Sequence, residues 1–164
     1  MTNPTPQVRL ARPQALGSAR AGGTPITAGA DALFVYGTLR FPRILSALLG
    51  RVPTGTPATV TGWRTAELKG RPYPGLVAAP GSTASGLLLS GLTAREWRVL
   101  DDFEDNEYDL RSLPLDGPVA DGAPRSGWAY TWESPDEVRP GNWDPDVFAA
   151  RVLDTYAARL EAGG

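Results

Sequence analysis

The sequence predicts a single α+β domain. Short runs rich in apolar and β-branched residues alternate with segments whose apolar residues recur at helical spacing. The chain of 164 residues is long enough for one domain with a buried core, and 41% of its residues are hydrophobic. With 16 prolines and 19 glycines, turns should be frequent and long helices few.

The first predicted elements are a buried strand and a short helix. Residues 33–36 are apolar and β-prone, as in a strand. The helix spans residues 42–49, because a proline suits its first position and Gly50 ends it. Its apolar side chains recur at helical spacing: Ile44, Leu45, Leu48 and Leu49.

The remaining strands are predicted from apolar or β-branched runs. They are residues 58–68, the turn and extended chain of 73–77, and residues 86–92, 108–115 and 127–132. Residues 116–126, between the last two, are rich in turn formers.

The chain closes with a predicted helix over residues 144–160. Asp144 suits its N-cap and Pro145 its first position. One face of this helix is apolar: Phe148, Val152, Tyr156 and Leu160.

The middle helix has the strongest local pattern. Thr93 and Glu96 form a capping box, and Leu92 and Trp97 lie where a hydrophobic staple would close it. Each residue of an α-helix is rotated by about 100° around the helix axis relative to the one before it. With Trp97 placed at zero, the apolar side chains cover the arc from about 200° to about 360°. This arc is formed by Val99, Phe103, Leu100 and Trp97.

Among the acids of the DDFED cluster, residues 101–105, Glu104 alone points into the apolar arc. It falls near about 340°, between Leu100 and Trp97. The other acids fall between about 40° and 140°, toward water. They are Asp101, Asp102 and Asp105.

Glu104 has two interpretations. The helix could fray there and leave the carboxylate in solvent, or the carboxylate could pair with an arginine in a purely structural role. Alternatively, Glu104 is half-buried among apolar side chains, where desolvation raises the pKa of a carboxyl group toward neutrality. Such a group suits a general base that must also act as an acid.

Two absences from the composition restrict the chemistry. The chain has no histidine and no cysteine. Ser-His-Asp triads, thiol nucleophiles, disulfides and the usual zinc sites are therefore excluded. Proton transfer must fall to a carboxylate, a tyrosine, Lys69 or the N-terminal amine. If the protein is an enzyme, we expect a carboxylate enzyme.

The charge pattern argues against large charged partners. A net charge of −2 gives no reason to expect nucleic acid. No apolar run has the length that a bilayer requires, so no membrane contact is expected. Residues 1–30 are rich in Pro, Gly and Thr and lack the pattern of a targeting peptide. We predict a flexible or loosely docked arm over residues 1–30 and a domain over residues 31–164.

The stretch LFVYGTLRFP, residues 33–42, ends its strand abruptly. Gly37 follows Tyr36, and then come a hydroxyl at Thr38 and a positive charge at Arg40. Taken alone, this could be a strand end and a tight turn selected for folding. A glycine there could also let the backbone approach a ligand and turn its N–H groups outward. Such amides, leading into a helix, suit a carboxylate or a developing oxyanion.

Three segments together resemble the gamma-glutamylcyclotransferase-like family, also called AIG2-like. They are FVYGTLR at residues 34–40, YPGLV at 73–77, and LDDFE at 100–104 followed by Tyr108. Their order and spacing fit from about Ala32 to Trp132. YGTL alone is short, but the three segments in this order form a fairly specific combination.

The resemblance implies a small α+β fold built around a mixed β-barrel with flanking short helices, and a cavity at the end of the first strand. It also implies a reaction in which the α-amine of a γ-glutamyl compound attacks its own γ-carbonyl. The products are 5-oxoproline and an amine or amino acid. No metal or organic cofactor is implied.

By position, the resemblance makes Glu104 the catalytic acid/base. It implies that the YGTL loop binds the substrate, with Tyr73 and Tyr108 lining the cavity. The loop residues are Tyr36, Gly37, Thr38 and Leu39. Closing a five-membered ring needs little beyond orientation, because both reacting groups belong to one molecule. One carboxylate can take a proton from the ammonium and return one to the leaving nitrogen.

The sequence departs from the family pattern in two places. Asp105 and Asn106 follow the FE pair where the family commonly has glycine, although asparagine can also end a helix. The family tends to show Tyr-x-Arg after this turn, whereas here Arg111 comes one place late after Tyr108. Arg111 should therefore point to the opposite side of its strand unless a bulge corrects it. The identity of the leaving group stays open for this reason.

Parts of the sequence could also fit three other functions. A calcium loop fails, because the glycine and glutamate that an EF-hand requires are missing after Asp101 or Asp102. Tryptophans could form a sugar-binding face, but the stripe Trp128, Tyr130 and Trp132 on one side of a strand is more typical of a barrel wall. The serious alternative is a non-catalytic module that binds a small molecule on the same fold.

The sequence therefore predicts a cytoplasmic enzyme, monomeric or weakly dimeric, that acts on a small γ-glutamyl molecule. Its acid/base is Glu104.

Overall fold

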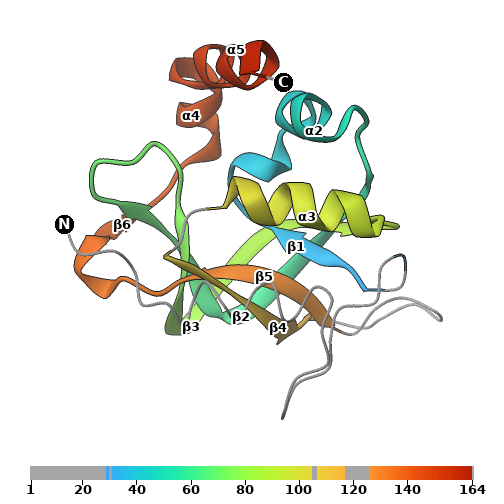
Figure 1. Cartoon of the computed structure of the whole chain (residues 1–164). Helices are drawn as coiled ribbons and strands as arrows, with labels where there is room; N and C mark the ends of the chain where they lie inside the picture. Colours follow the sequence, from blue (N-terminus) through green and yellow to red (C-terminus); the bar gives the residue numbers. More distant parts are fainter. Residues whose placement is uncertain (1–28, 30, 105–106, 117–125, 164) are drawn as a thin grey trace.

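A computed structural model describes residue 29 and residues 31–104, 107–116 and 126–163. Six strands in these ranges form one sheet in the order β4-β5-β1-β3-β2-β6. Figure 1 shows the helices gathered on one side of the sheet. The predicted arm over residues 1–30 and the loop 117–125 lie almost entirely outside the described residues. No helix in the described ranges is both long and apolar enough to cross a membrane.

The sheet is mixed and curls upon itself. Its strands are β1 (Leu33–Val35), β2 (Thr54–Leu68), β3 (Gly75–Ser90), β4 (Tyr108–Pro114), β5 (Ser126–Trp132) and β6 (Val138–Asn142). Strand β1 lies antiparallel to β3 and parallel to β5. Beyond the end of β1, β3 reaches β5 directly, with Leu76 opposite Thr131. This closure makes the small barrel that the sequence led us to expect.

A long hairpin of β2 and β3 supplies most of the barrel wall. Two predicted stretches, residues 73–77 and 86–92, belong largely to the single strand β3. The two stretches were predicted separately, yet β3 is continuous because it pairs with β2 along most of its length. The register shifts near Gly62, whose φ is 90°, a value that favours glycine.

Alternation along β1 separates two apolar clusters. Leu33 and Val35 pack with the cluster that includes side chains of the helices. Phe34 and Tyr36 pack in a second cluster, inside the curl of the sheet. All of these side chains are buried. The strand is therefore fixed from both faces, and its end is held in a defined position.

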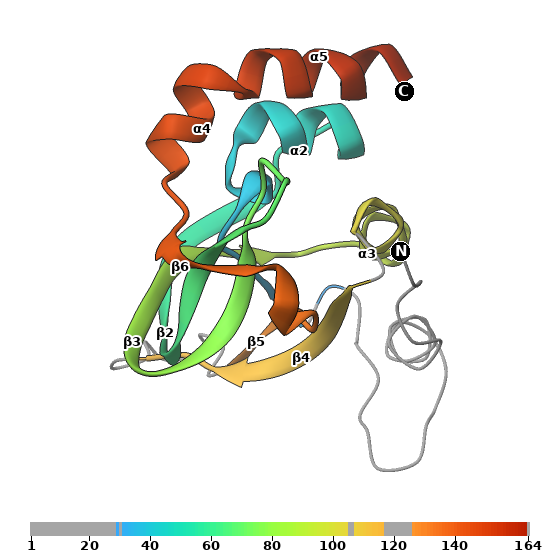
Figure 2. The same cartoon turned by 90° about the vertical axis from the view of Figure 1, so that its left-hand side faces the viewer.

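Four α-helices in the described ranges cover the sheet. They are α2 (Pro42–Leu49), α3 (Ala94–Phe103), α4 (Pro145–Arg151) and α5 (Leu153–Gly163). Helices α2 and α5 lie side by side in Figure 2, and Arg43 joins them through ion pairs with Asp154 at 2.8 Å and Glu161 at 3.2 Å. Helix α2 has the predicted bounds and ends at Gly50, whose φ is 77°.

Two elements near the C-terminus differ from the prediction. The helix expected over residues 144–160 is divided into α4 and α5 at Val152, which has a φ of −126°. The N–H of Val152 and that of Tyr156 keep helical hydrogen bonds across the bend, and the apolar repeat continues through it. The sequence pattern therefore does not reveal the bend. Strand β6 was not predicted, since its proline and glycine indicate a turn, and it forms only an edge pairing with β2.

The capping box of α3 is formed as predicted. The Glu96 N–H donates to Oγ1 of Thr93 at 3.1 Å, and the Thr93 N–H donates to Oε1 of Glu96 at 3.0 Å. Arg51 adds two hydrogen bonds of 2.6 Å to the same carboxylate. The Glu96 side chain is only 5% exposed, whereas that of Arg51 is 47% exposed.

Replacing Glu96 with glutamine should lower the free energy of unfolding at pH 7 by about 1–2 kcal/mol, a modest value because Arg51 is half-exposed. The hydrogen bonds from Arg51, followed by those from Thr93, hold the pKa of Glu96 below its usual value against the opposing effect of burial. The charged pair therefore stabilises the fold above the unfolded-state pKa, and this contribution is lost as the pH falls through the folded-state pKa. Urea denaturation of both proteins between pH 7 and pH 3.5 should show the gap closing. If the difference in free energy of unfolding between the two proteins did not change with pH, the loss would come from the glutamine side chain and not from the missing negative charge.

Candidate active site

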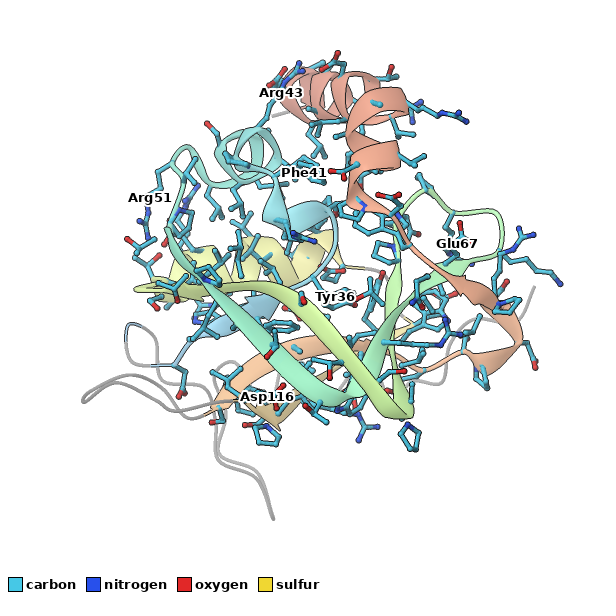
Figure 3. All side chains as sticks on the ribbon, turned by 180° about the vertical axis from the view of Figure 1, so that it is seen from behind. Tyr36, Phe41, Arg43, Arg51, Glu67 and Asp116 are labelled. Atoms are coloured by element: carbon cyan, nitrogen blue, oxygen red, sulfur yellow. The ribbon has the colours of Figure 1, made fainter. Side chains whose placement is uncertain are left out.

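The first strand ends in a tight turn that starts the site. Residues 38–40 form a short 3₁₀ turn, in which the Arg40 N–H donates to the Gly37 carbonyl at 3.0 Å. The phenol of Tyr36, inside the curled sheet in Figure 3, donates to the Tyr130 carbonyl of β5 at 2.5 Å. Tyr36 thus fills the space just beyond β1 and joins its end to β5. The strand stops one residue earlier than predicted.

A cavity opens at this turn. It encloses about 330 Å³, including its mouth. All seven residues that the sequence predicted for the site line it: Tyr36, Gly37, Thr38, Leu39, Tyr73, Glu104 and Tyr108. Four further lining residues were not predicted: Phe34, Val35, Pro74 and Tyr130.

Glu104 comes to the cavity from the end of α3. It is the C-cap residue, with φ −76° and ψ 142°. Its N–H still bonds the Leu100 carbonyl at 3.2 Å, so its Cα continues the helical path and the predicted direction holds. Its side chain is half-buried and lines the cavity. Asp105 and Asn106, where the family has glycine, lie outside the described residues.

The prediction that Asp101 faces water is wrong. Asp101 is 6% exposed, and its Oδ1 accepts a hydrogen bond of 3.1 Å from the Tyr130 hydroxyl. The buried arc of α3 is therefore wider than apolar residues alone indicate, because a polar partner on β5 compensates the burial of this carboxyl group. Asp102, the next residue, is exposed as predicted.

Tyr130 connects the two halves of the site. Its carbonyl receives the Tyr36 hydroxyl, while its own hydroxyl reaches Asp101 on the helix that ends at Glu104. Alternation in residues 127–132 had placed Tyr130 on a barrel-wall stripe, and the side chains of Tyr130 and Trp132 are indeed buried in the core. The sequence could not reveal that the hydroxyl of this wall residue meets a carboxylate.

Tyr36 is a neutral hydrogen-bond donor in this setting. Burial raises the pKa of its phenol well above the ordinary value, and the nearby charge of Glu104 raises it further, while a hydrogen bond with the Leu76 backbone lowers it. The phenol therefore does not serve as a base. Among the described lining residues, the remaining ionisable side chains are Glu104 and the phenols of three other tyrosines.

The YPG segment packs against the glycine turn. A Cβ added to Gly37 would lie 2.8 Å from Cγ of Pro74, so this side of the glycine is filled by the proline ring. The Tyr108 hydroxyl donates to the Pro74 carbonyl at 2.5 Å, and the rings of Tyr73 and Tyr108 lie 6.5 Å apart. Glycine at position 37 thus allows the two loops to meet at the wall of the cavity.

Arg111 points away from the site, as its late position in the sequence predicted. Strand β4 pairs with β5 without a register shift, and Arg111 lies opposite Ala129. Its guanidinium donates to Glu133 at 3.1 Å and to Oγ1 of Thr131 at 3.1 Å. No bulge in β4 brings it back, so the arginine of the family pattern has no counterpart at this position of the cavity wall.

The fold and cavity define a class of protein: a small α+β domain with a closed mixed sheet, whose site combines one carboxylate with the turn after the first strand. Residues 33–145 match the family described as "Gamma-glutamyl cyclotransferase, AIG2-like". The chain belongs to this family.

Relatives from Arabidopsis thaliana agree with this assignment. AIG2-like protein C is 35% identical over 114 residues, which cover 68% of this chain and 65% of the relative, slightly less than two thirds of its length. AIG2-like protein D is 33% identical over 113 residues, covering 68% of this chain and 74% of the relative.

Solved structures share the fold. One solution structure of an Arabidopsis thaliana protein matches with a TM-score of 0.58 and 26% identity, covering 82% of this chain and 91% of that one. A second has a TM-score of 0.61 and 24% identity, covering 86% and 88% of the two chains.

Proposed function

We propose that this protein is a γ-glutamyl cyclotransferase. The α-amine of a γ-glutamyl compound attacks the γ-carbonyl carbon of the same molecule. A ring C–N bond forms and the bond to the leaving nitrogen breaks, so that the products are 5-oxoproline and an amine or amino acid. The observation that carries the proposal is that Glu104 and the turn at residues 36–39 border one cavity.

Glu104 is the acid/base of this reaction. The substrate ammonium must lose a proton before it can attack, and the leaving nitrogen must gain one before it departs. A single carboxylate next to both nitrogens can carry the proton from the first to the second. The step balances without a metal or organic cofactor, and it needs neither of the residue types that the chain lacks.

The turn after β1 holds the glutamyl head. Backbone N–H groups at residues 36–39 bind its carboxylate or the developing oxyanion, and Thr38 adds a hydroxyl donor. Tyr73 and Tyr108 line the same cavity. Because ring closure is intramolecular, holding the chain of the substrate in a bent shape supplies most of the catalysis.

We further propose that the protein works in the cytoplasm as a monomer or weak dimer. Large exposed hydrophobic side chains among the described residues are limited to Val52 and Val147. These two side chains are too few for the apolar core of an obligate interface.

Incubation with a panel of γ-glutamyl compounds tests the function. The panel contains a γ-glutamyl amino acid, a γ-glutamyl peptide and a γ-glutamyl amine, and 5-oxoproline is measured by chromatography. We expect release above the buffer control from at least one of them. If none yields 5-oxoproline, the proposed activity is wrong and the binding module remains.

A further inference from the structure

A second cleft adjoins the catalytic cavity and carries positive charge. It lies among the turn after β1, the strands β2 and β3, and the start of α4, and encloses about 800 Å³ including its mouth. Tyr36 lines both hollows, and Arg40 in this cleft directly follows Leu39 in the cavity. We name it the Arg40 cleft; its main polar side chains are Arg40, Arg64, Thr65, Ser82, Thr83 and Ser85.

The positive charge of the Arg40 cleft is not neutralised by acidic side chains among its lining residues. Its lining includes Arg40 and Arg64 and no carboxylate. The cleft beside Arg71 is different, since Glu67 and Asp144 line it too, and Arg71 pairs with Glu107 at 3.3 Å. Of these two clefts, only the Arg40 cleft therefore has an electrostatic preference for an anion.

The two arginines contribute differently. Arg64 donates to the carbonyls of Arg139 at 2.8 Å and Gly141 at 3.2 Å and to Oδ1 of Asn142 at 3.1 Å. These acceptors are neutral, so Arg64 is a fixed positive charge with few donors to spare. The half-buried Arg40 side chain makes no hydrogen bond or ion pair with the described residues. Its guanidinium can therefore give a fork of donors to a carboxylate.

We propose that the Arg40 cleft binds the carboxylate of the leaving amine, so that the preferred substrates are γ-glutamyl amino acids or short γ-glutamyl peptides. This inference rests on the proposed function, which puts the glutamyl head in the adjoining cavity. The leaving half then extends past the turn at residues 37–39, next to Arg40. Arg111, the arginine that the family pattern would place near the substrate, points to the face of β4 that is turned away from the cavity.

A matched pair of ligands tests the inference. γ-Glutamyl-alanine and γ-glutamyl-alaninamide differ only in the carboxylate, and their dissociation constants are measured by calorimetry on the Glu104→Gln protein, so that no turnover interferes. We expect the acid to bind about tenfold more tightly, the value of a charge-assisted hydrogen bond in a partly solvated cleft.

Arg40→Gln in the same background should reduce this ratio to about twofold or less, and Arg40→Lys should keep part of it, since lysine retains the charge but not the fork. Arg98→Gln is the matched control, because it removes an exposed arginine from α3 and should leave the ratio unchanged. Thermal denaturation verifies that each variant is folded. Equal affinity for acid and amide, a ratio unaffected by Arg40→Gln, or binding of neither ligand would each overturn the proposal.

Turnover by the unmodified protein separates this inference from the proposed function. If 5-oxoproline forms equally fast from both ligands at low concentration, the cyclotransferase stands and the Arg40 cleft is wrong. If the acid binds preferentially but no 5-oxoproline appears, carboxylate binding by the Arg40 cleft is supported and the proposed cyclotransferase activity is wrong.

Discussion

Replacing Glu104 with glutamine is expected to lower the rate of 5-oxoproline release about a thousandfold, within the range of a lost general acid/base. Glutamine keeps the volume of the side chain and can still form hydrogen bonds, but it cannot accept the proton of the substrate ammonium. The measurement is kcat with γ-glutamyl-alanine for the two proteins at pH 7. Affinity for the substrate should change far less than turnover.

Asp102→Asn is the matched control for this experiment. It makes the same carboxylate-to-amide change near the end of α3, but on an exposed side chain. We expect its turnover to equal that of the unmodified protein. If Glu104→Gln retained full turnover, another group would have to carry the proton, and our mechanism would fail even with the family assignment intact.

The second large effect concerns stability. A Cβ on Gly86 would overlap the carbonyl oxygen of Val35 and lie 3.0 Å from its carbonyl carbon. Both are backbone atoms of β1, so alanine cannot be accommodated without separating β1 from β3. We expect Gly86→Ala to lower the free energy of unfolding by about 3 kcal/mol or more. Urea denaturation at pH 7 measures it.

Gly55→Ala shows whether the effect is local. Gly55 lies in the same hairpin, but its added Cβ would meet Cδ2 of the Leu89 side chain at 3.3 Å, and this side chain can move. We expect a loss below about 1 kcal/mol there. Equal losses at both positions would mean that glycine is needed in this hairpin for a reason other than the approach of Val35.

Local patterns in the sequence predicted the parts of the site that local patterns determine. Helical periodicity directed Glu104 toward the core, and the capping box defined where α3 begins. The residues that border the cavity were implied by the family that the three short motifs resemble. The predictions for Glu104 and for the start of α3 hold because each depends on neighbours within a few positions.

Long-range contacts decide what the sequence did not reveal. Asp101 is buried because Tyr130, 29 positions later, supplies its partner. Strand β3 is continuous because β2 pairs with it, and β6 exists because an edge of β2 is free to receive it. The Arg40 cleft likewise combines side chains from four distant segments, so no local pattern marks it.

The two bonds of Tyr130 have a consequence for catalysis. Its backbone braces the end of β1 and its hydroxyl braces the helix that presents Glu104. The turn after β1 and Glu104, to which we assign substrate binding and proton transfer, are therefore held in place by the fold itself. Because the protein is already organised in this way, little of the binding free energy is needed to rearrange it. The binding free energy can instead hold the ligand in a bent conformation.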